Sequence, residues 1–533
     1  MAKLTVTVID TIGIQSYIFG SNLLKQNVGA SELVRCATQD WVYQALVELG
    51  TTNVDESGAM NDQATIEGDA VDSELVYSGG GNTVVLFRSP DAAREFTRRL
   101  TRRALQEAPG LQLVVAHTEF DWDVEALSQV VKATLEKARQ KKQHPSVSSP
   151  LLGLGVTADC QYTGLPAVDK NQDGKRVSAE VQAKEAAFEV AHQRLTGLLP
   201  LNGYGVPKDF DDFGRVWGES SYIAVIHTDG NGMGKRVASI AEGHPRPEDN
   251  RRYIQAIRAF SKSVQDTAEE ALQATYRQLI QSIDQDGKIG GVVPVRDGKL
   301  PLRPIVLGGD DVTFVCDGRL GLTLTEFYLR QVTAKPLADG NPLSVRAGIA
   351  VVKSHFPFAR AYALAEDLAR SAKRYLNERR APPYNEDGLS AIDWHFAISG
   401  VVLDLEQIRE REYTVEAGRL TMRPVRLGST GEINLAPMVP SDWRSWETFA
   451  AIVQEFRSEG WAERRNKIKA LRNALRNGLE AVRQFLAVYD LPPLYLVPGH
   501  PDSARTGWIG GRCVCFDAIE ALEFFVPLEG GQG

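Results

Sequence analysis

The stretch that decides the fold is LRPIVLGGDDVTFVC, residues 302–316, in which two apolar runs flank Gly308, Gly309, Asp310 and Asp311. Apolar and β-branched residues on both sides of a Gly-Gly pair are typical of a β-hairpin with a tight turn. The turn itself needs only the glycines, which adopt backbone angles that a Cβ atom disfavours. Two adjacent carboxylates at its tip are the feature that a turn alone leaves unexplained.

The segments around this hairpin predict one complete fold unit. A β-branched run, typical of a strand, precedes the hairpin, and a long stretch with helical periodicity separates this strand from the hairpin. Another helix, a strand and a further helix follow the hairpin. The expected strands are 221–230, 302–316 as a hairpin, and 343–352, and the expected helices are 247–283, 322–335 and 358–380. The order β-α-β-β-α-β predicts a ferredoxin-like palm.

The N-terminal part of the chain repeats this order. It offers a strand at 4–10, helical periodicity over 21–49, a hairpin at 74–87, a helix at 90–107 and a strand at 111–120. Aligning the hairpins sets Gly79-Gly80-Gly81-Asn82 against Gly308-Gly309-Asp310-Asp311, and Asp10 falls opposite Asp229. The first copy thus lacks the hairpin carboxylates. Residues 51–74 are acidic without a basic residue and predict a flexible surface insertion.

The second copy predicts a metal and nucleotide site. The end of its first strand and its hairpin turn lie side by side in a palm, so Asp229, Asp310 and Asp311 are expected to converge as catalytic and metal-ligating residues. Carboxylates suit Mg²⁺ or Mn²⁺, and two such ions can activate a hydroxyl and stabilise departing pyrophosphate. The expected nucleotide contacts are Gly230, Asn231, Gly232, Gly234, Lys235, Gly308, Gly309 and Lys373, with Gly80, Gly81 and Asn82 of the first copy.

Simpler interpretations of these residues stay open at this point. GGDD and DGNG are both good turn sequences, and surface lysines such as Lys235 and Lys373 are common. The SGGGN stretch that contains Asn82 also suits a tight turn, and His227 lies on an apolar strand where a packed core residue is expected.

Composition limits the class of protein. The 533 residues suit several domains, and 43% hydrophobic and 24% charged residues are ordinary for a globular chain. The net charge of −8 argues against a basic nucleic-acid coat. No signal peptide, no membrane-spanning run and no disulfide framework among five scattered cysteines are recognisable, so a cytoplasmic location without membrane contact is expected.

Five motifs together resemble the Cas-ten (Cmr-two) family, the large subunit of type III CRISPR effector complexes. They are IQSYIFGSNLLKQNVGAS, YSGGGN, HTDGNGMGK, LGGDDVTF and GIAVVKSHFPFARAYALAEDLARSAK, which lie within residues 1–395. The resemblance implies two face-to-face palms with a nucleotide groove between them. It also implies conversion of ATP to cyclic oligoadenylate messengers in antiviral defence, with other effector subunits and guide or target RNA as partners. Asp229, Asp310 and Asp311 match the family's metal-binding acidic residues.

The chain also departs from this family. It starts directly at the first palm and contains no His-Asp dipeptide, so DNA nuclease activity is not expected. Between the palms Cys160 is kept, but Thr163 stands in place of a second cysteine, so no structural zinc is expected. Asn231 stands where the family often has a second aspartate, which is expected to weaken the metal site without abolishing it.

The expected architecture is α+β with two tandem palms (nucleotidyl cyclase-like). Its predicted domains are a first palm at 1–149, a helical connector with a zinc-ribbon remnant at 150–220, a second palm at 221–396, and a C-terminal region at 397–533 that is strand-rich at first and then helical. The C-terminal helices carry a basic row that suits either a solvated face or a partner or RNA surface: Arg464, Arg465, Lys467, Lys469, Arg472 and Arg476.

Three functions fit these observations. The first is a nucleotidyltransferase that cyclises ATP into an oligoadenylate messenger. The second is a catalytically quiet structural subunit of an RNA-guided complex, which the intact carboxylate set disfavours because clustered like charges repel. The third is a diguanylate cyclase-like enzyme, which the inactive, covalently attached first copy disfavours.

Overall fold

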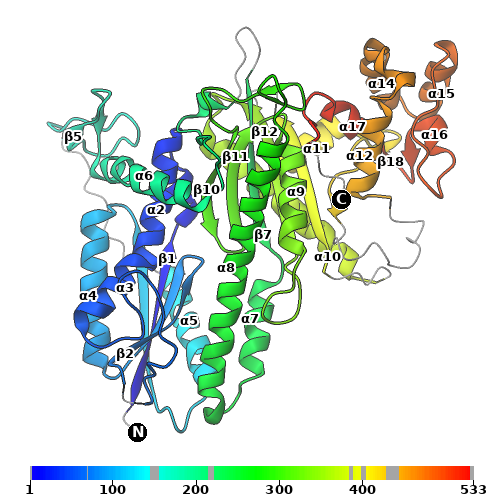
Figure 1. The fold of residues 1–533 in the computed structure, drawn as a ribbon. Coiled ribbons are helices and arrows are strands. Elements are labelled where there is room, and N and C mark those ends of the chain that lie inside the picture. The colour runs from blue at the N-terminus through cyan, green and yellow to red at the C-terminus, as the bar shows by residue number, and fades with distance from the viewer. Residues whose placement is uncertain are drawn as a thin grey trace.

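The computed structural model describes residues 3–68, 70–143, 155–213, 221–382, 388–397, 404–427 and 443–528. They form a mixed α+β architecture with two main sheets, each built from a separate part of the chain. Figure 1 shows the N-terminal sheet and its helices beside the second sheet, with the C-terminal helices on the far side of the second sheet. Among the described residues, no helix is long and apolar enough to cross a membrane.

The first repeat is a four-stranded antiparallel sheet in the order β2-β3-β1-β4. Its apolar strand residues are buried because helices cover the sheet, as the core residues of β1 and β3 show. The strands are β1 (Leu4–Ile12), β2 (Ser73–Gly79), β3 (Asn82–Phe87) and β4 (Gln112–Phe120), and the main helices are α1 (Ile14–Phe19), α2 (Leu24–Thr38), α3 (Asp40–Leu49), α4 (Pro90–Glu107) and α5 (Leu127–Gln143).

The second repeat has the same strand order, β10-β11-β7-β12, and continues with β13 and β16 at the β12 edge. The added strand β13 runs parallel to β12. The strands are β7 (Tyr222–Gly230), β10 (Leu302–Gly308), β11 (Asp311–Asp317), β12 (Val345–Lys353), β13 (Ser390–Ala397) and β16 (Val425–Leu427), and the helices are α7 (Met233–Glu242), α8 (Asn250–Gln281), α9 (Gly321–Thr333) and α10 (Phe358–Arg380).

The two repeats agree down to an irregularity in the hairpin. The β2–β3 register shifts between Leu75 and Tyr77, and the β10–β11 register shifts between Pro304 and Val306. Each bulge therefore lies at the same distance from its turn. A bulge bends and twists a strand, so both hairpins leave their sheets in the same way, as the alignment of the two copies predicts.

Helix α8 joins the two repeats (Figure 1). Its first turns pack Tyr253, Ile254 and Ile257 into the core of the first repeat, whereas Phe260 and later residues such as Leu272 belong to the core of the second. One continuous helix with an apolar stripe over this length holds both cores. The chain therefore positions its two hairpins relative to each other through α8.

The segment between the repeats is described over 155–213, so the remainder of the predicted connector 150–220 lies outside the described residues. It contains a short hairpin of β5 (Asp169–Lys170) and β6 (Arg176–Val177) before α6 (Ala179–Leu198) and the short η1 (Phe210–Asp212). The expected helical connector thus also contains a short β-hairpin. Helix α6 packs along α2, where a Cβ on Gly29 would lie 1.7 Å from the Lys184 carbonyl oxygen.

The expected strand-rich start of the C-terminal region is also wrong in part. Residues 405–413 form a helix, and residues 398–403 lie outside the described residues. The elements are α11 (Leu405–Tyr413), β14 (Thr414–Val415), β15 (Gly418–Arg419), α12 (Trp446–Glu455), α13 (Glu459–Ala462), α14 (Arg465–Arg476), α15 (Leu479–Val488), α16 (Ser503–Thr506), β17 (Trp508–Ile509), β18 (Arg512–Cys513) and α17 (Phe516–Ala521). A charged, helix-favouring run (EQIRERE) explains α11. The further short strands β8 (Lys288–Ile289) and β9 (Val293–Pro294) pair with each other.

The acidic segment 51–74 is not simply a surface insertion. Ile66 and Val71 are buried in the first core, and Glu67 pairs with Arg251 of α8. Buried apolar residues and an ion pair to another element anchor the described part of this segment, which acidic composition alone did not indicate.

Candidate active site at the hairpin of the second repeat

The sheet brings the three predicted carboxylates to one edge. Asp229 is the next-to-last residue of β7, and Asp311 begins β11 on the neighbouring strand, where Thr228 faces Val312. Asp310 occupies the turn between β10 and β11. A Cβ on Gly230 would lie 2.8 Å from both the Cβ and Oδ2 of Asp310, so the two backbones approach closely. The convergence that strand order predicted is present.

The turn geometry depends on Gly309. Gly308 pairs with Asp311, which leaves Gly309 and Asp310 as the two turn residues, and Gly309 has a φ of +80°. A two-residue hairpin with glycine at a positive φ in its first position is typical of a type II′ turn. In the first repeat both turn residues, Gly80 and Gly81, have positive φ, as a type I′ turn requires. The second turn therefore tolerates a side chain, that of Asp310, where the first demands glycine.

Arg346 is the cation of this edge. It lies on β12 directly opposite Asp229 and is 8% exposed. Its guanidinium donates to the Asp229 carboxylate, to the Gly230 carbonyl oxygen at 3.0 Å and to the Asn231 side-chain oxygen at 3.2 Å. Arg346 therefore fixes both Asp229 and the start of the loop that follows it.

The carboxylates remain mutually repelling despite this cation. Burial, followed by the charge of Asp229, raises the pKa of Asp310 to about 6, and burial with the charges of Asp229 and Asp310 raises the pKa of Asp311 to about 8. Burial also raises the pKa of Asp229, against the opposing effects of Arg346 and Lys373. Three acids with raised pKa values in one place form a site that favours added positive charge.

The donor set fits a hard divalent cation. The Oδ1 atom of Asp311 is buried without a hydrogen-bond partner, although the side chain as a whole is 46% exposed. Carboxylate oxygens are the ligands that Mg²⁺ and Mn²⁺ prefer. Within the residues that the structure describes, no three His, Cys, Asp or Glu side chains are already arranged as a closed metal-binding group. Because the Asp229 carboxylate pairs with Arg346, metal binding requires it either to rotate away from Arg346 or to contact Arg346 and the metal ion together.

The predicted phosphate loop follows Asp229 directly. Asn231 is buried, its backbone N–H donates to the Ser344 carbonyl oxygen at 2.8 Å, and its side-chain Nδ2 has no partner. Gly232 then caps α7 with a φ of +72°, and a Cβ on Gly232 or Gly234 would meet open space. Lys235 is exposed on the first turn of this helix. The loop thus presents a helix N-terminus beside the carboxylates.

Two further residues adjoin this edge. Lys373 on α10 is exposed and lies close enough to Asp229 to lower its pKa. His227 is buried, as its apolar strand predicts, but its Nδ1 lies 3.4 Å from Asp311 Oδ1. Burial and Arg346 lower the pKa of His227 to about 4. His227 is therefore neutral near pH 7 and leaves the Asp311 charge uncompensated.

The equivalent edge of the first repeat is occupied by an ion pair. Asp10 lies opposite Asn82, and its carboxylate is 2.5 Å from Nζ of Lys142 on α5. Helix α5 follows the fourth strand of its sheet, just as α10 follows β12. Asn82 Oδ1 is buried without a partner, and Thr11 donates to the Gly81 carbonyl oxygen at 3.0 Å. The first repeat keeps one carboxylate and neutralises it internally.

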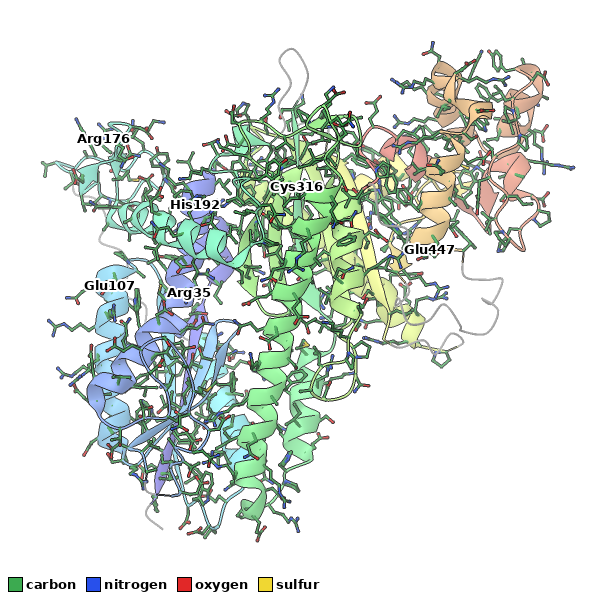
Figure 2. The ribbon with its side chains drawn as sticks, in the orientation of Figure 1. Arg35, Glu107, Arg176, His192, Cys316 and Glu447 are labelled. Atoms are coloured by element: carbon green, nitrogen blue, oxygen red, sulfur yellow. The ribbon has the colours of Figure 1, made fainter. Side chains whose placement is uncertain are left out.

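A cleft brings the two hairpins together. Its volume is about 120 Å³, and its wall includes Gly80 and Gly81 of the first repeat with Gly308 and Asp311 of the second. Buried Glu32 of α2 also lines it, held by Arg35 at 2.7 Å and by Arg194 of α6 at 2.8 Å. Figure 2 shows Arg35 on α2 and His192 on the adjacent α6, where α6 reaches the second repeat through the 3.1 Å contact of His192 with Arg303.

Sequence reasoning predicted Lys235 and Lys373 but missed the arginines of this site. Arg346 is the only charged residue in the predicted strand LSVRAGIAVV (343–352). A lone arginine in an otherwise apolar strand was the signal that could have identified it. The Glu32, Arg35 and Arg194 group had no comparable signal, because its members come from α2 and α6, which are far apart in sequence. Only the packing of α6 on α2 brings them together.

The connector retains a single thiol of the expected remnant. Cys160 is buried, and its sulfur accepts a hydrogen bond from the Tyr162 N–H at 3.4 Å. Backbone and Thr163 hydrogen bonds outweigh burial and lower the pKa of Cys160. Thr163 Oγ1 instead contacts Ser178 Oγ at 3.4 Å. The expected absence of structural zinc from this loop stays a prediction to be tested.

No protein-family model matches the sequence, and no curated protein matches it.

Solved structures do match the fold. A Csm1–Csm4 cassette in complex with pppApApA aligns with a TM-score of 0.52 at 12% identity, over 98% of this chain and 69% of the other. A Csm1–Csm4 cassette in complex with AMPPNP aligns with a TM-score of 0.52 at 13% identity, over 98% and 70%. The Csm1–Csm4 subcomplex in the type III-A CRISPR-Csm interference complex gives 0.50 at 14%, over 98% and 70%. The chain therefore has the fold of these Csm1–Csm4 structures, in agreement with its resemblance to the Cas-ten (Cmr-two) family.

Proposed function

We propose that this chain is a nucleotidyltransferase of the Cas-ten (Cmr-two) type that joins ATP into a cyclic oligoadenylate. The observation that carries the proposal is the cleft in which Gly80 and Gly81 of one hairpin face Gly308 and Asp311 of the other. Bond formation between two nucleotides needs both held in one place. In this proposal the two repeats are palms, one carrying the reactive carboxylates and one supplying a second nucleotide surface.

Asp229, Asp310 and Asp311 would hold Mg²⁺ or Mn²⁺ in a two-metal site. Bound there, the metal ions would favour deprotonation of an attacking 3′-hydroxyl and offset the charge of the departing pyrophosphate. Arg346 orients Asp229 and keeps the Asp229–Asn231 segment in place through its three contacts. The Gly230–Lys235 loop offers backbone N–H groups and a helix N-terminus to phosphate oxygens, with Lys235 and Lys373 as neutralising cations.

The first repeat would bind the acceptor nucleotide. A Cβ on Gly80 of its hairpin would meet open space among the described residues. Asn82 has a buried side-chain oxygen without a partner, which suits a donor group of a nucleotide. Arg35 and Arg194 would screen the phosphates of a nucleotide on this side of the cleft, although Glu32 already neutralises part of their charge.

The comparisons favour adenine nucleotides and an assembly. Csm1–Csm4 cassettes of this fold were solved with pppApApA and with AMPPNP, and one is a part of a type III-A CRISPR-Csm interference complex. We extend these two properties to this chain by fold similarity. ATP would be the substrate, and other effector subunits with guide or target RNA would be the partners.

A quiet structural subunit is the main alternative. A purely structural chain has no need of three carboxylates whose pKa values are raised by their mutual repulsion and burial. A diguanylate cyclase-like enzyme is less consistent with the Asp10–Lys142 pair, which neutralises one of the two sites.

The test is an ATP polymerisation assay on the purified chain with Mg²⁺ or Mn²⁺, with GTP in parallel. We expect adenylate oligomers that disappear in Asp229→Ala and Asp310→Ala, with unchanged circular dichroism. Removing catalytic metal ligands should lower the rate by at least about 100-fold. Synthesis that persists in both variants would refute the site, and no synthesis by the wild type, with or without target RNA and partner subunits, would favour the structural alternative.

A further inference from the structure

A second cavity lies between the second repeat and the C-terminal region and shares no lining residue with the cleft of the candidate active site. Its volume is about 200 Å³, and α10, α11, β15 and β18 contribute to its wall. Its most frequent lining residue is arginine: Arg374, Arg409, Arg419, Arg423, Arg444 and Arg512. Glu378 and Glu406 are the acidic residues of the same wall.

Half of these guanidinium groups have carboxylate partners. Arg374 pairs with Glu406, Arg409 contacts Asp393 at 2.6 Å, and Arg423 lies 3.5 Å from both Asp517 and Glu520. The carboxylates of these pairs offset the charges of Arg374, Arg409 and Arg423. They leave the charge of the remaining three arginines to be explained.

The other three lack such partners among the described residues. Arg444 donates to the carbonyl oxygens of Met422 and Pro424 at 2.8 and 2.9 Å, and Arg512 donates to that of Thr421 at 2.9 Å. Arg419 is exposed at the cavity rim. Carbonyl oxygens satisfy hydrogen bonds without cancelling a full positive charge, so the cavity concentrates cations that an anion would stabilise.

Two observations support a built anion site. Arg423 is 2% exposed, yet its Nε atom has no hydrogen-bond partner, and its Nη1 atom has only the long 3.5 Å contact with Asp517. Burial, followed by the charges of Arg444 and Arg419, lowers the pKa of Arg512 to about 10, against the opposing effect of Asp517. Buried donors without acceptors destabilise a protein unless a ligand or water satisfies them.

The lining favours a phosphate group over a nucleobase. Its two aromatic residues are buried, and each already stacks on a guanidinium: Tyr375 under Arg444 at 4.4 Å and Tyr413 under Arg423 at 4.9 Å. No ring is thus free for a base. The cavity of about 200 Å³ therefore offers guanidinium groups to an anion and no aromatic contact to a base.

We propose that this arginine-lined cavity binds a condensed phosphate, either free pyrophosphate or the triphosphate tail of a nucleotide whose sugar and base stay outside. The two sources present the same chemistry to Arg419, Arg444 and Arg512. The site is independent of the proposed polymerisation, since none of its residues contacts the carboxylate edge.

The test is isothermal titration of the full chain with pyrophosphate in EDTA, which removes divalent cations and so disfavours phosphate binding at the carboxylates. We expect one site whose affinity falls at least tenfold in Arg419→Met and in Arg512→Met. Arg419 is exposed, so its variant is expected to fold, and circular dichroism checks both. Arg370→Met is the matched control, because Arg370 lies on α10 near Arg374 but outside the cavity and pairs with Asp367.

Further arms separate the sources. Tighter binding of pyrophosphate than of ATP indicates the free anion, and the reverse indicates a nucleotide tail, and both support the site. Absence of binding, equal loss in Arg370→Met, or sulfate binding as tightly as pyrophosphate at equal ionic strength would overturn it. Because no readout involves synthesis, an inactive wild-type chain would contradict the proposed function and leave this result intact.

Discussion

At the scale of single residues, the partner of one aspartate across the sheet distinguishes the two repeats. Asp229 faces Arg346 across β12, and the aligned Asp10 faces Val114 across β4. The first repeat therefore draws its cation from α5 as Lys142, whereas the second has an arginine within the sheet. An arginine in a central strand is buried and positioned by its neighbours, and it can hold a carboxylate and a loop at once. A lysine from a helix end neutralises only the carboxylate.

The raised pKa of Asp311 predicts a pH-dependent stability. Its folded pKa of about 8 exceeds the ordinary value, so the folded state binds the proton more tightly and loses stability as the pH rises from about 4 to about 8. In EDTA, Asp311→Asn should be more stable than wild type at pH 9 by about 1 kcal/mol after solvent screening. The difference should vanish near pH 4. Urea unfolding at both pH values measures this, and an equal difference at the two would contradict it.

Metal binding should also depend on pH, but stabilisation by the metal should increase as the pH rises. Mn²⁺ displaces protons from Asp310 and Asp311, whose pKa values lie near 6 and 8, so the rise in melting temperature on adding Mn²⁺ should be larger at pH 8 than at pH 5.5. Asp310→Asn should lose most of this rise. A rise that is independent of pH, or unchanged in the variant, would place the metal elsewhere.

The two aspartates of the first strands should differ in importance. Asp10→Ala breaks one partly exposed ion pair with Lys142 and should lower stability by no more than about 1 kcal/mol, with most synthesis retained. Asp229→Ala should remove synthesis. Parallel assays of both variants measure the asymmetry, and equal damage would mean that the first copy also holds metal.

At the scale of elements, the two hairpins have the same bulge and different turns. The bulge aims each turn, and the turn type then decides whether a side chain can stand at its second position. Gly81 at φ +80° closes against Ile14, where a Cβ would lie 2.6 Å from Cδ1, whereas Asp310 is free of that constraint. The first hairpin therefore presents a turn without side chains (Gly80 and Gly81) to the cleft, whereas the second presents carboxylates.

A bulky side chain at Gly80 should block binding of the proposed acceptor nucleotide. A side chain at Gly80 would extend into open space beside the cleft, so Gly80→Phe should lower synthesis at least about tenfold while the Mn²⁺-induced rise in melting temperature persists. Gly80→Asn is the matched variant, since asparagine tolerates the φ of +60° and is smaller, and its loss should be clearly less. Equal losses in both would indicate turn strain and not obstruction.

The α2–α6 contact should be intolerant of any side chain. A Cβ on Gly29 would lie 1.7 Å from the Lys184 carbonyl oxygen, so Gly29→Ala should destabilise the fold by about 1–3 kcal/mol. Gly197→Ala on α6 is the control, because its Cβ meets nothing within 4 Å and alanine favours a helix by up to about 1 kcal/mol. Denaturant titration compares the two, and similar stabilities would show that these helices do not pack closely.

At the scale of the whole molecule, α8 makes one body of two repeats. Its first turns belong to one core and its later turns to the other, so the separation of the two hairpins depends on a continuous helix and on α6. The C-terminal helices pack on the far side of the second repeat (Figure 1). None of the six residues of their basic row lines the cleft, and Arg472 and Lys469 pair with Glu520 and Glu523.

The chain as a whole is predicted to bind no structural zinc and to cut no DNA. Structural zinc needs about four ligands, mostly cysteines, and Cys160 stands alone among the described connector residues. Elemental analysis after chelator washing should give zinc well below one equivalent, and single-stranded DNA should stay intact with Mn²⁺. Stoichiometric zinc would refute the first statement, and cleavage that survives Asp310→Ala would refute the second.

The sequence by itself determined the repeat, the strand order and the three carboxylates. Alternating apolar residues, helical periodicity and glycine turns are local signals, and Asp310 and Asp311 lie within one hairpin. Local signals also misled where composition was ambiguous: the acidic segment 51–74 contains buried Ile66, and 405–413 is helical.

Tertiary structure alone decided which charges meet. Arg346 reaches Asp229 through strand pairing, and Glu32 is held by cations from two helices. The cavity of Arg419, Arg444 and Arg512 forms where β15, β18 and the segment before α12 meet α10 and α11. Electrostatic energies depend on distance and burial, and neither follows from spacing along the chain. The chain's sequence therefore identifies the three carboxylates of the candidate site, and its folding supplies the arginine that positions Asp229.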